Sequence, residues 1–351
     1  MERATPRIMG RTEAPTELRA WGFLLFPGFP MACLTSAIEP LRAANEIMGR
    51  PEFSWSLLGE EPGAVRSSAA VRFDTDLALA EAEGLDALVC LSPPDARFAA
   101  PRASNAALRR LGRLGTVLGG FSGGVFPLMR AGAMGTHRPA VHWCYEAAWE
   151  AEFPDAEWSR SAIMREKGRV TVAGAGAVFD LMLRVVEERG GRALTTEVAC
   201  WFQHPFMRDE AARQTMPVSR AGGTQALLPA PVREAIRLFA QHIGDPLPIA
   251  EVAARVSLSE RTLERAFKAA TGEGPLRHYR RMRLERGRQR VLYSTDSLTE
   301  IARSVGYASS TDFARRYAET FGIHPAQERR RLAGLRGLAG AVPPEGDGPA
   351  G

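Results

Sequence analysis

The apolar positions of residues 249–271 have the spacing of two consecutive helices. Four of them recur at three- and four-residue intervals and form one helical face: Ile249, Val252, Ala253 and Val256. After a short turn, Ser259 is placed to cap a second helix that carries Leu263 and Phe267 on its inner side. This succession of helix, turn and helix is typical of the helix-turn-helix motif.

The same plan recurs at residues 298–321. Its first helix has an apolar face made of Leu298, Ile301, Ala302 and Val305. Gly306 permits a sharp turn, and Ser309 or Ser310 caps the next helix. The inner side of that helix consists of Phe313, Tyr317 and Phe321. An internal repeat of one supersecondary unit is hard to produce by chance, so this repeat is the strongest signal in the chain.

A basic helix predicted from Pro275 to about Tyr293 joins the two units. Their second helices start 50 residues apart, at Ser259 and Ser309. Proline suits the first position of the connecting helix, which at about 1.5 Å per residue spans roughly 28 Å. That length approaches the separation of about 34 Å between successive major-groove faces of DNA. One monomer is therefore expected to read two adjacent segments of the major groove.

The first 205 residues show a different pattern, in which apolar strands alternate with amphipathic helices. The predicted strands are Trp21–Phe26, Phe53–Leu58, Val71–Phe73, Leu85–Pro93 and Gly115–Gly119. The predicted helices are Met31–Met48, Asn105–Leu114 and Thr195–His204. Such alternation predicts a doubly wound α/β domain, whose ligand crevice lies beyond the carboxyl ends of the strands. The glycine-rich stretch Gly119–Met129 is typical of a turn at such a crevice, although similar turns also occur without a ligand.

Composition divides the chain further. Residues 1–17 and 334–351 are rich in polar residues, Gly, Ala and Pro, which predicts disordered tails on either side of the two domains. The α/β domain is expected at 18–206 and the all-α domain at 230–333, with a polar, Gly- and Pro-containing linker at 207–229.

Charge is distributed unevenly between the two parts. Residues 230–335 contain 19 Lys and Arg against 12 Asp and Glu, a net charge of +7. The whole chain is +5, so the remainder is about −2. A basic module joined to a mildly acidic one suggests that the first binds a polyanion and the second a small molecule.

The sequence carries no sign of a metal, a cofactor or a membrane anchor. Its four cysteines are far apart, with no CxxC pair and no nearby histidine cluster: Cys33, Cys90, Cys144 and Cys200. This pattern argues against zinc and, in a chain of this size, favours a reducing cytoplasm. The N-terminal segment lacks the apolar core of a signal peptide, and no apolar run reaches about 18 residues.

The C-terminal region resembles the DNA-binding domain of the AraC/XylS family of bacterial transcription regulators. The resemblance rests on the Ile301–Tyr307 turn, the Phe313–Tyr317 register and the closing FGIHP at Phe321–Pro325. It implies base-reading roles for Arg261, Glu264 and Arg265 in the first unit and for Ser310, Thr311 and Arg315 in the second. Ala314 stands where a contact is often made and offers only a methyl group.

Residues 20–205 resemble the PfpI-like domain, a flavodoxin-like relative of the class I glutamine amidotransferases. The matching stretches are Ser36–Ile47, Gly119–Gly135, Ala140–Trp143 and Val170–Gly191. Many AraC-type regulators carry this domain as their sensor. The Ser36–Ile47 helix is similar to that of regulators of carnitine, choline and betaine catabolism or of arginine use.

The elbow after the glycine-rich strand bears on the enzyme question. In catalytic members of the family, and in some regulators, a cysteine occupies this elbow. The matching position here is assigned to Phe121, and a phenyl ring cannot attack a carbonyl, so the resemblance implies a domain without catalysis. Ser122, one residue further, is expected to cap the following helix rather than to act as a nucleophile.

The same resemblance gives candidates for effector binding. His142 stands at a family histidine position and Glu39 at a family acidic one. A quaternary amine would favour an aromatic cage, each ring contributing about 0.5–2 kcal/mol. Phe121 and Trp143, with Trp149 as a further candidate, are expected to form the cage beside Ser122; the alternative for both tryptophans is a place in the core.

These observations favour a cytoplasmic transcription regulator, an activator that responds to a small amine or amino-acid-like metabolite. The family resemblance implies promoter DNA, RNA polymerase and a second copy of the chain as partners. Two alternatives stay open. One is an amidase or glyoxalase-like hydrolase that is tethered to DNA; the other is a constitutive architectural protein, which would show no ligand-dependent thermal stability.

Overall fold

A computed structural model describes residues 18–166, 168–204 and 228–337, together with Met207, Ala212 and Gln214. The chain divides into two compact units, with one boundary between Gln214 and Thr215 and a second between Leu335 and Arg336. The predicted tail 1–17 and most of the predicted linker lie outside the described residues. The first boundary falls inside the predicted linker because Ala212 and Gln214 hydrogen-bond to the first unit. The start of the other predicted tail is helical, since the last helix extends to Gly337.

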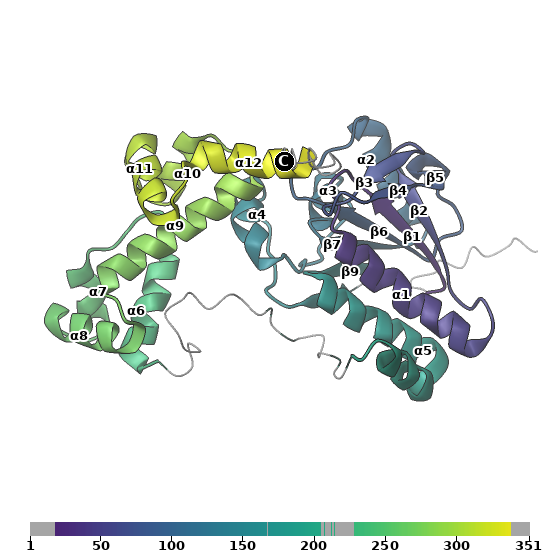
Figure 1. Cartoon of the computed structure of the whole chain (residues 1–351), viewed down its shortest axis with the longest axis horizontal. Coiled ribbons are helices and arrows are strands. Elements are labelled where there is room, and N and C mark those ends of the chain that lie inside the picture. The colour runs from purple at the N-terminus through teal and green to yellow at the C-terminus, as the bar shows by residue number, and fades with distance from the viewer. Residues whose placement is uncertain are drawn as a thin grey trace, which may run out of the picture. The chain divides into compact units, whose positions relative to one another are not determined.

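The first unit is built on a seven-stranded sheet of order β5-β2-β1-β6-β7-β9-β8 (Figure 1). All neighbouring strands run parallel except β8 and β9, which are antiparallel. The strands are β1 Ala20–Leu25, β2 Ser54–Gly59, β5 Leu77–Ala78, β6 Ala87–Ser92, β7 Val117–Ser122, β8 Ile163–Glu166 and β9 Arg169–Val172. A separate hairpin pairs β3 Ala64–Arg66 with β4 Arg72–Asp74, so the strand predicted at Val71–Phe73 lies outside the main sheet.

The order of the parallel strands identifies the fold class. Counted along the chain, β1, β2, β6, β7 and β9 take the spatial order 2-1-3-4-5, which is the flavodoxin order. Helices α1 (Met31–Met48) and α5 (Ala175–Trp201) lie side by side on one face of the sheet (Figure 1). They enclose a core with alternate strand residues such as Phe23, Val89 and Phe121. The remaining helices of the unit are α2 Pro101–Arg113, α3 Val125–Arg130 and α4 Glu146–Glu152, with short 3-10 turns at Leu79–Glu81 and Trp143–Tyr145.

Helix α5 changes direction at Gly191, whose backbone is left-handed (φ 74°, ψ 178°). Its second arm contains most of the helix predicted at Thr195–His204. The chain just after that arm is tied back to the first arm, because His204 Nε2 lies 2.8 Å from Oδ1 of the buried Asp180.

The second unit is entirely helical, as predicted. Its helices are α6 Ala230–Gln241, α7 Ile249–Arg255, α8 Glu260–Thr271, α9 Pro275–Tyr293, α10 Leu298–Ser304, α11 Ser310–Phe321 and α12 Pro325–Gly337. They enclose two small cores. Helix α9 contributes to both, with Tyr279 in the core around α8 and Leu284 and Val291 in the core around α11. Its 19 residues span roughly 28 Å, in agreement with the predicted connector.

Candidate DNA interface and effector site

The first helix-turn-helix is formed by α7 and α8. Ser257 makes the turn with a left-handed backbone (φ 57°). The Ser259 hydroxyl then accepts a hydrogen bond from the Thr262 amide at 3.2 Å and so caps α8. Leu263 and Phe267 are completely buried, which leaves the opposite side of α8 exposed. That side carries two of the predicted base-reading residues, Arg261 and Arg265, and neither pairs with a carboxylate within residues 228–337.

Glu264 differs from its two neighbours on α8. Its carboxylate lies against Gly274, where an added Cβ would come within 2.4 Å of Oε1. The side chain is thus directed toward the turn between α8 and α9, although it remains exposed. For Glu264 to contact a base, its side chain would have to change rotamer. Arg261 and Arg265 have no carboxylate partner within residues 228–337, so neither would have to break an ion pair first.

The second helix-turn-helix is formed by α10 and α11. Gly306 makes the turn with φ 73°, and the Ser309 hydroxyl accepts from the Asp312 amide at 3.1 Å. Thr311 is exposed and Ser310 partly so. Arg315, the third predicted reader, donates to Asp312 at 2.5 Å and to Glu319 at 3.1 Å. Ala314 belongs to the core, since only 8% of its surface is exposed.

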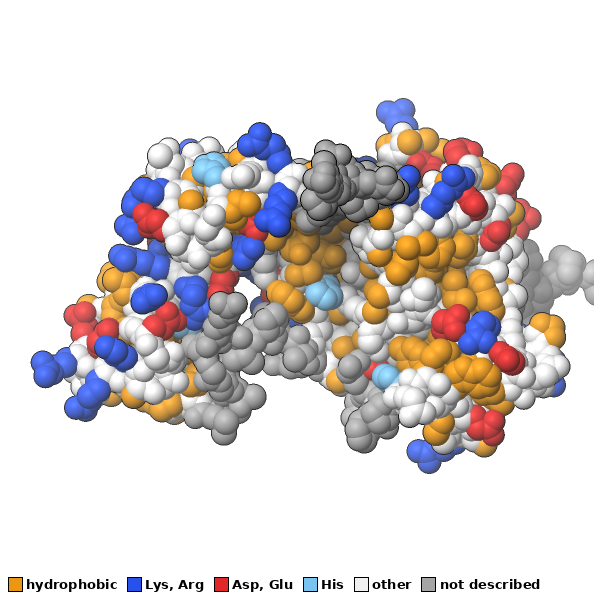
Figure 2. Space-filling model, in the orientation of Figure 1, with side chains coloured by type: hydrophobic (Ala, Val, Ile, Leu, Met, Phe, Trp, Pro, Cys, Tyr) orange, Lys and Arg blue, Asp and Glu red, His pale blue; other side chains and the backbone are white. Residues whose placement is uncertain are grey.

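The arginines of α9 serve mainly to hold the unit together. Arg283 donates to the carbonyls of Val305 at 2.7 Å and Gly306 at 2.5 Å, and lies 4.5 Å from the Tyr307 ring centre. Arg288 pairs with Glu328. Arg280 remains exposed. Figure 2 shows Lys and Arg side chains over much of the visible face of this unit, with acidic side chains among them.

The elbow of the first unit is Ser122, not Phe121. Ser122 ends β7 with a left-handed backbone (φ 56°). Phe121 is completely buried and packs in the core beside α1 and α5. The prediction that Phe121 occupies the elbow and contacts a ligand is therefore wrong. The sequence held a signal that would have found the register: Gly120–Gly124 fits the pattern Gly-x-Ser-x-Gly, in which the serine takes the strained turn.

Two glycines allow this elbow to pack tightly. A Cβ on Gly123 would lie 2.3 Å from the Ser92 carbonyl oxygen, and one on Gly124 would lie 1.8 Å from the Cys90 carbonyl oxygen. The Ser92 hydroxyl also donates to the Gly123 carbonyl at 3.0 Å. The cap of α3 is Gly124, so Ser122 is not the predicted helix cap. Its hydroxyl has no hydrogen-bond partner in the part of the chain that the structure describes.

His142 is held as a neutral imidazole. Its Nδ1 accepts from the Cys144 amide at 3.2 Å and lies 2.8 Å from the Cys144 sulfur. Burial lowers the pKa of His142 to about 4, because the charged form would lose its hydration. With Nδ1 acting as an acceptor, the proton of the neutral ring is on Nε2. That nitrogen lies 3.6 Å from the place where Gly174 lacks a Cβ.

Ser122 and His142 lie at the same edge of the sheet. Phe121 of β7 is in register with Val172 of β9, so Ser122 and Gly174 both follow the carboxyl ends of adjacent parallel strands. The edge thus offers a serine hydroxyl, an imidazole N–H and the first amides of α5. A base with a pKa of about 4 is poorly matched to proton abstraction near pH 7.

The other predicted ligand residues are only partly brought together here. Trp143 is half-buried and packs against His142, with ring centres 5.5 Å apart. Trp149 is a core residue, completely buried against Phe126. Glu39 pairs with Arg42 on its own helix at 2.9 Å, and its side chain is 41% exposed. The predicted cage of Phe121, Trp143 and Trp149 does not form; Tyr145, whose ring centre lies 5.4 Å from that of His142, was not predicted.

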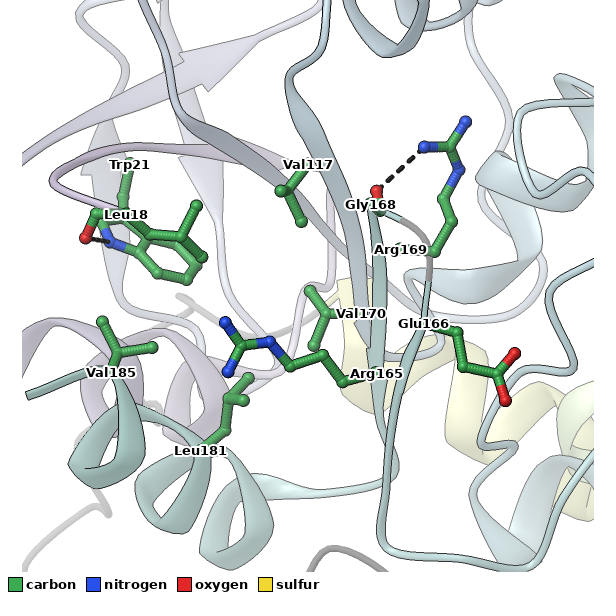
Figure 3. A pocket seen from close by; sticks show the side chains of 10 residues that line it. All are labelled: Leu18, Trp21, Val117, Arg165, Glu166, Gly168, Arg169, Val170, Leu181 and Val185. Atoms are coloured by element: carbon green, nitrogen blue, oxygen red, sulfur yellow. Dashed lines mark hydrogen bonds between the residues drawn. The ribbon is translucent and has the colours of Figure 1, made fainter. Parts of the chain in front are cut away.

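A separate cavity of about 260 Å³ opens at the opposite, amino edge of the sheet. Figure 3 shows its apolar wall, with Trp21, Val170 and Leu181, and the Arg165 side chain extending across it. Arg165 pairs with Glu188, and Arg169, a second cation that lines the cavity, donates to the carbonyls of Ala133 and Gly168.

Two further findings concern the described residues alone. None of their helices is long and apolar enough to cross a membrane. They also contain no group of three or more His, Cys, Asp or Glu side chains that could hold a metal ion.

A flavodoxin-like unit followed by paired helix-turn-helix motifs defines a class of DNA-binding regulators with an attached α/β domain. Comparison with known proteins agrees. A family model described as a helix-turn-helix domain matches residues 252–331. The HTH-type transcriptional regulator GbdR of Pseudomonas aeruginosa is 30% identical over 88% of this chain and 83% of its own. The regulator GlxA of Rhizobium meliloti is 32% identical over 88% and 95%, and ArgR of P. aeruginosa is 30% identical over 89% and 93%.

The chain belongs to the AraC-type family of transcriptional regulators. Because these relatives are named as regulators across nearly the whole chain, the protein is a DNA-binding regulator rather than a hydrolase that is tethered to DNA. The reason given from the sequence, a phenylalanine at the elbow, does not apply, because Ser122 makes the turn there.

Proposed function

We propose that this protein is a ligand-responsive regulator whose effector binds at the carboxyl edge of the sheet, beside Ser122 and His142. The observation that carries the proposal is a strained elbow whose serine hydroxyl is unpaired among the described residues and lies at the same edge as a neutral histidine. Backbone strain of this kind persists where the surrounding structure holds it, often at a ligand site. The sensor needs no cofactor under this proposal.

The chemistry of the edge favours an effector that carries a carboxylate. The Ser122 hydroxyl, His142 Nε2–H and the first amides of α5 are all donors, and the positive end of a helix dipole adds to them. The half-buried rings of Trp143 and Tyr145 could face an ammonium group. A small zwitterion, either an amino acid or a betaine, satisfies both ends. Glu39 is not required, because Arg42 already neutralises it.

A thermal-shift titration of the full chain tests this effector class. Glycine betaine, carnitine and arginine each carry a carboxylate, whereas choline keeps the quaternary ammonium without it. We expect at least one zwitterion to raise the melting temperature and choline to leave it unchanged. Saturation at about 100 times Kd stabilises the native state by roughly 2.7 kcal/mol.

Ser122→Ala should lose most of that shift, because it removes one donor and leaves the turn in place. Ser54→Ala is the matched control, since Ser54 is exposed at the start of β2. A shift with choline equal to that with betaine would show that the carboxylate is not recognised. An equal shift in Ser122→Ala would place the effector elsewhere, with the cavity of Figure 3 as the next candidate.

We further propose that the protein works in the cytoplasm as a homodimer that activates transcription through contact with RNA polymerase. Membership of the AraC-type family supports these points. Sedimentation of the full chain measures the oligomeric state, and a monomer at micromolar concentration would contradict the dimer. Run-off transcription with purified polymerase measures the sign of regulation, and less transcript on addition of the protein would contradict an activator.

A further inference from the structure

The last described residues before the boundary at Thr215 form a short strap, defined here as Ala212 and Gln214. The Ala212 carbonyl accepts a hydrogen bond from the Ala162 amide at 2.8 Å. The Gln214 amide in turn donates to the Arg160 carbonyl at 3.0 Å. These two backbone bonds hold the strap alongside residues 160–162.

The Gln214 side chain extends the strap to a second segment. Its amide nitrogen donates to the carbonyl of Val141 at 2.7 Å and to that of Ser161 at 3.2 Å. Its oxygen accepts from the Trp143 amide at 2.9 Å. A single side chain therefore grips the backbone on both sides of His142.

That segment is the one that the effector is proposed to contact. The His142 ring lies against Gly174, and Trp143 packs on His142. The Val141 amide donates to the Ser159 carbonyl at 3.2 Å, and the Ser159 amide donates to the Pro139 carbonyl at 2.8 Å. Residues 139–143, 159–162 and the strap thus form one continuous patch of backbone hydrogen bonds. A displacement of Trp143 must either move Gln214 or break its bonds.

The strap precedes the second unit along the chain. Gln214 stands immediately before the boundary at Thr215, and α6 begins at Ala230. We infer that Gln214 is a relay: it reads the position of the His142–Trp143 segment and passes it along the chain to the DNA-binding helices. This inference rests on the proposed function, because a relay is useful only if the first unit senses an effector. The relay itself requires only that the His142–Trp143 segment has two arrangements that differ in their hydrogen bonds to Gln214.

A double-mutant cycle tests the relay without any effector. The full chain is titrated with an operator duplex selected from a random-sequence library, and its Kd is measured by fluorescence anisotropy. Trp143→Ala, which disturbs the segment, should change the operator Kd by fivefold or more in the otherwise unaltered chain. In the Gln214→Ala background the same substitution should change Kd by less than twofold, because the contact that transmits it is gone.

Gln203→Ala is the matched control background, because the exposed Gln203 side chain bonds, among the described residues, only to the nearby Cys200 carbonyl. Trp143→Ala should keep its full effect there. Thermal melts confirm folding, and Trp143→Phe replaces Trp143→Ala if the latter unfolds. Equal effects of the Trp143 substitution in both Gln214 backgrounds, or none in the unaltered chain, would overturn the relay. Neither result depends on whether a zwitterion binds, so the relay and the effector class can fail separately.

Hydrogen exchange gives a second measurement. Gln214→Ala should increase the exchange rate of the Trp143 amide, which loses its acceptor, by tenfold or more. The Val141 amide, which donates to Ser159, should change much less. An unchanged rate at Trp143 would show that Gln214 does not hold this segment in solution.

Discussion

At the scale of single residues, the decisive feature is the backbone of Ser122. A left-handed conformation costs a non-glycine residue of order 1–3 kcal/mol, yet serine occupies this position directly before two glycines. The hydroxyl is therefore kept for its chemistry, not for the turn. Burial lowers the pKa of His142, which makes it a weak base, and under the proposed function the Ser122 hydroxyl hydrogen-bonds to the effector.

The two recognition helices also differ residue by residue. Arg265 of α8 has no carboxylate partner within residues 228–337, whereas Arg315 of α11 is already bonded to Asp312 and Glu319. We expect Arg265→Ala to weaken operator binding by roughly tenfold or more while random duplex binding falls much less. Arg315→Ala should weaken operator binding less. To contact a base, Arg315 must first break its ion pairs, and the energy that this costs offsets part of the gain from the base contact.

The measurement is a titration of selected operator and random duplex at one salt concentration. Equal losses on both duplexes for Arg265→Ala would assign Arg265 to phosphate contact instead of base reading. A larger specific loss for Arg315→Ala than for Arg265→Ala would reverse the proposed ranking of the two helices.

At the scale of elements, the helix-turn-helix pairs were predictable because periodic apolar faces and serine caps are local signals. The boundaries of α1 and α9 agree with the sequence prediction. The elbow register was missed by one residue, although Gly120–Gly124 fits the Gly-x-Ser-x-Gly pattern, in which the serine takes the strained turn. No sequence pattern predicted the contacts of Gln214. Its side chain bonds to three backbone groups from distant segments, while its own stretch of sequence resembles a linker.

The turn at Gly306 allows the cost of a steric clash to be separated from the cost of a strained backbone. Gly306 and Gly322 have nearly equal φ values of 73° and 72°. An added Cβ on Gly306 would lie 2.6 Å from Pro246, while at Gly322 it would meet nothing within 4 Å. Gly322→Ala should therefore cost about 1 kcal/mol from strain alone, and Gly306→Ala about 2 kcal/mol or more.

Urea unfolding of the full chain, monitored through the second unit, measures both variants against the unaltered protein. Gly322→Ala serves as the control for the left-handed backbone. Equal destabilisation by the two substitutions would show that the ring of Pro246 yields without cost and that packing at this turn does not matter.

At the scale of the whole molecule, the charge asymmetry and the connector specify how DNA is engaged. The region 230–335 carries a net charge of +7, and α9 sets the two recognition helices on one stiff element of roughly 28 Å. We expect this rigid connector to fix the spacing of two contacted DNA segments, in contrast to a flexible tether, which would tolerate many spacings.

Operators with altered spacing test this rigidity. Inserting five base pairs between the two contacted segments rotates one of them by half a turn, and we expect the affinity to fall by about tenfold or more. Inserting ten should not restore it, because α9 cannot lengthen to reach the next turn. Recovery with ten base pairs, measured by the same anisotropy titration, would indicate that the two motifs are loosely joined.

The sharing of α9 between two cores has a further consequence for the history of the domain. Tyr279 belongs to one core and Val291 to the other, on a single uninterrupted helix. Neither helix-turn-helix motif could be exchanged alone for that of another regulator, because the exchanged motif would lack the part of its core that α9 supplies. New promoter preferences must instead arise through substitutions on the outer surfaces of α8 and α11, with the shared interior inherited intact.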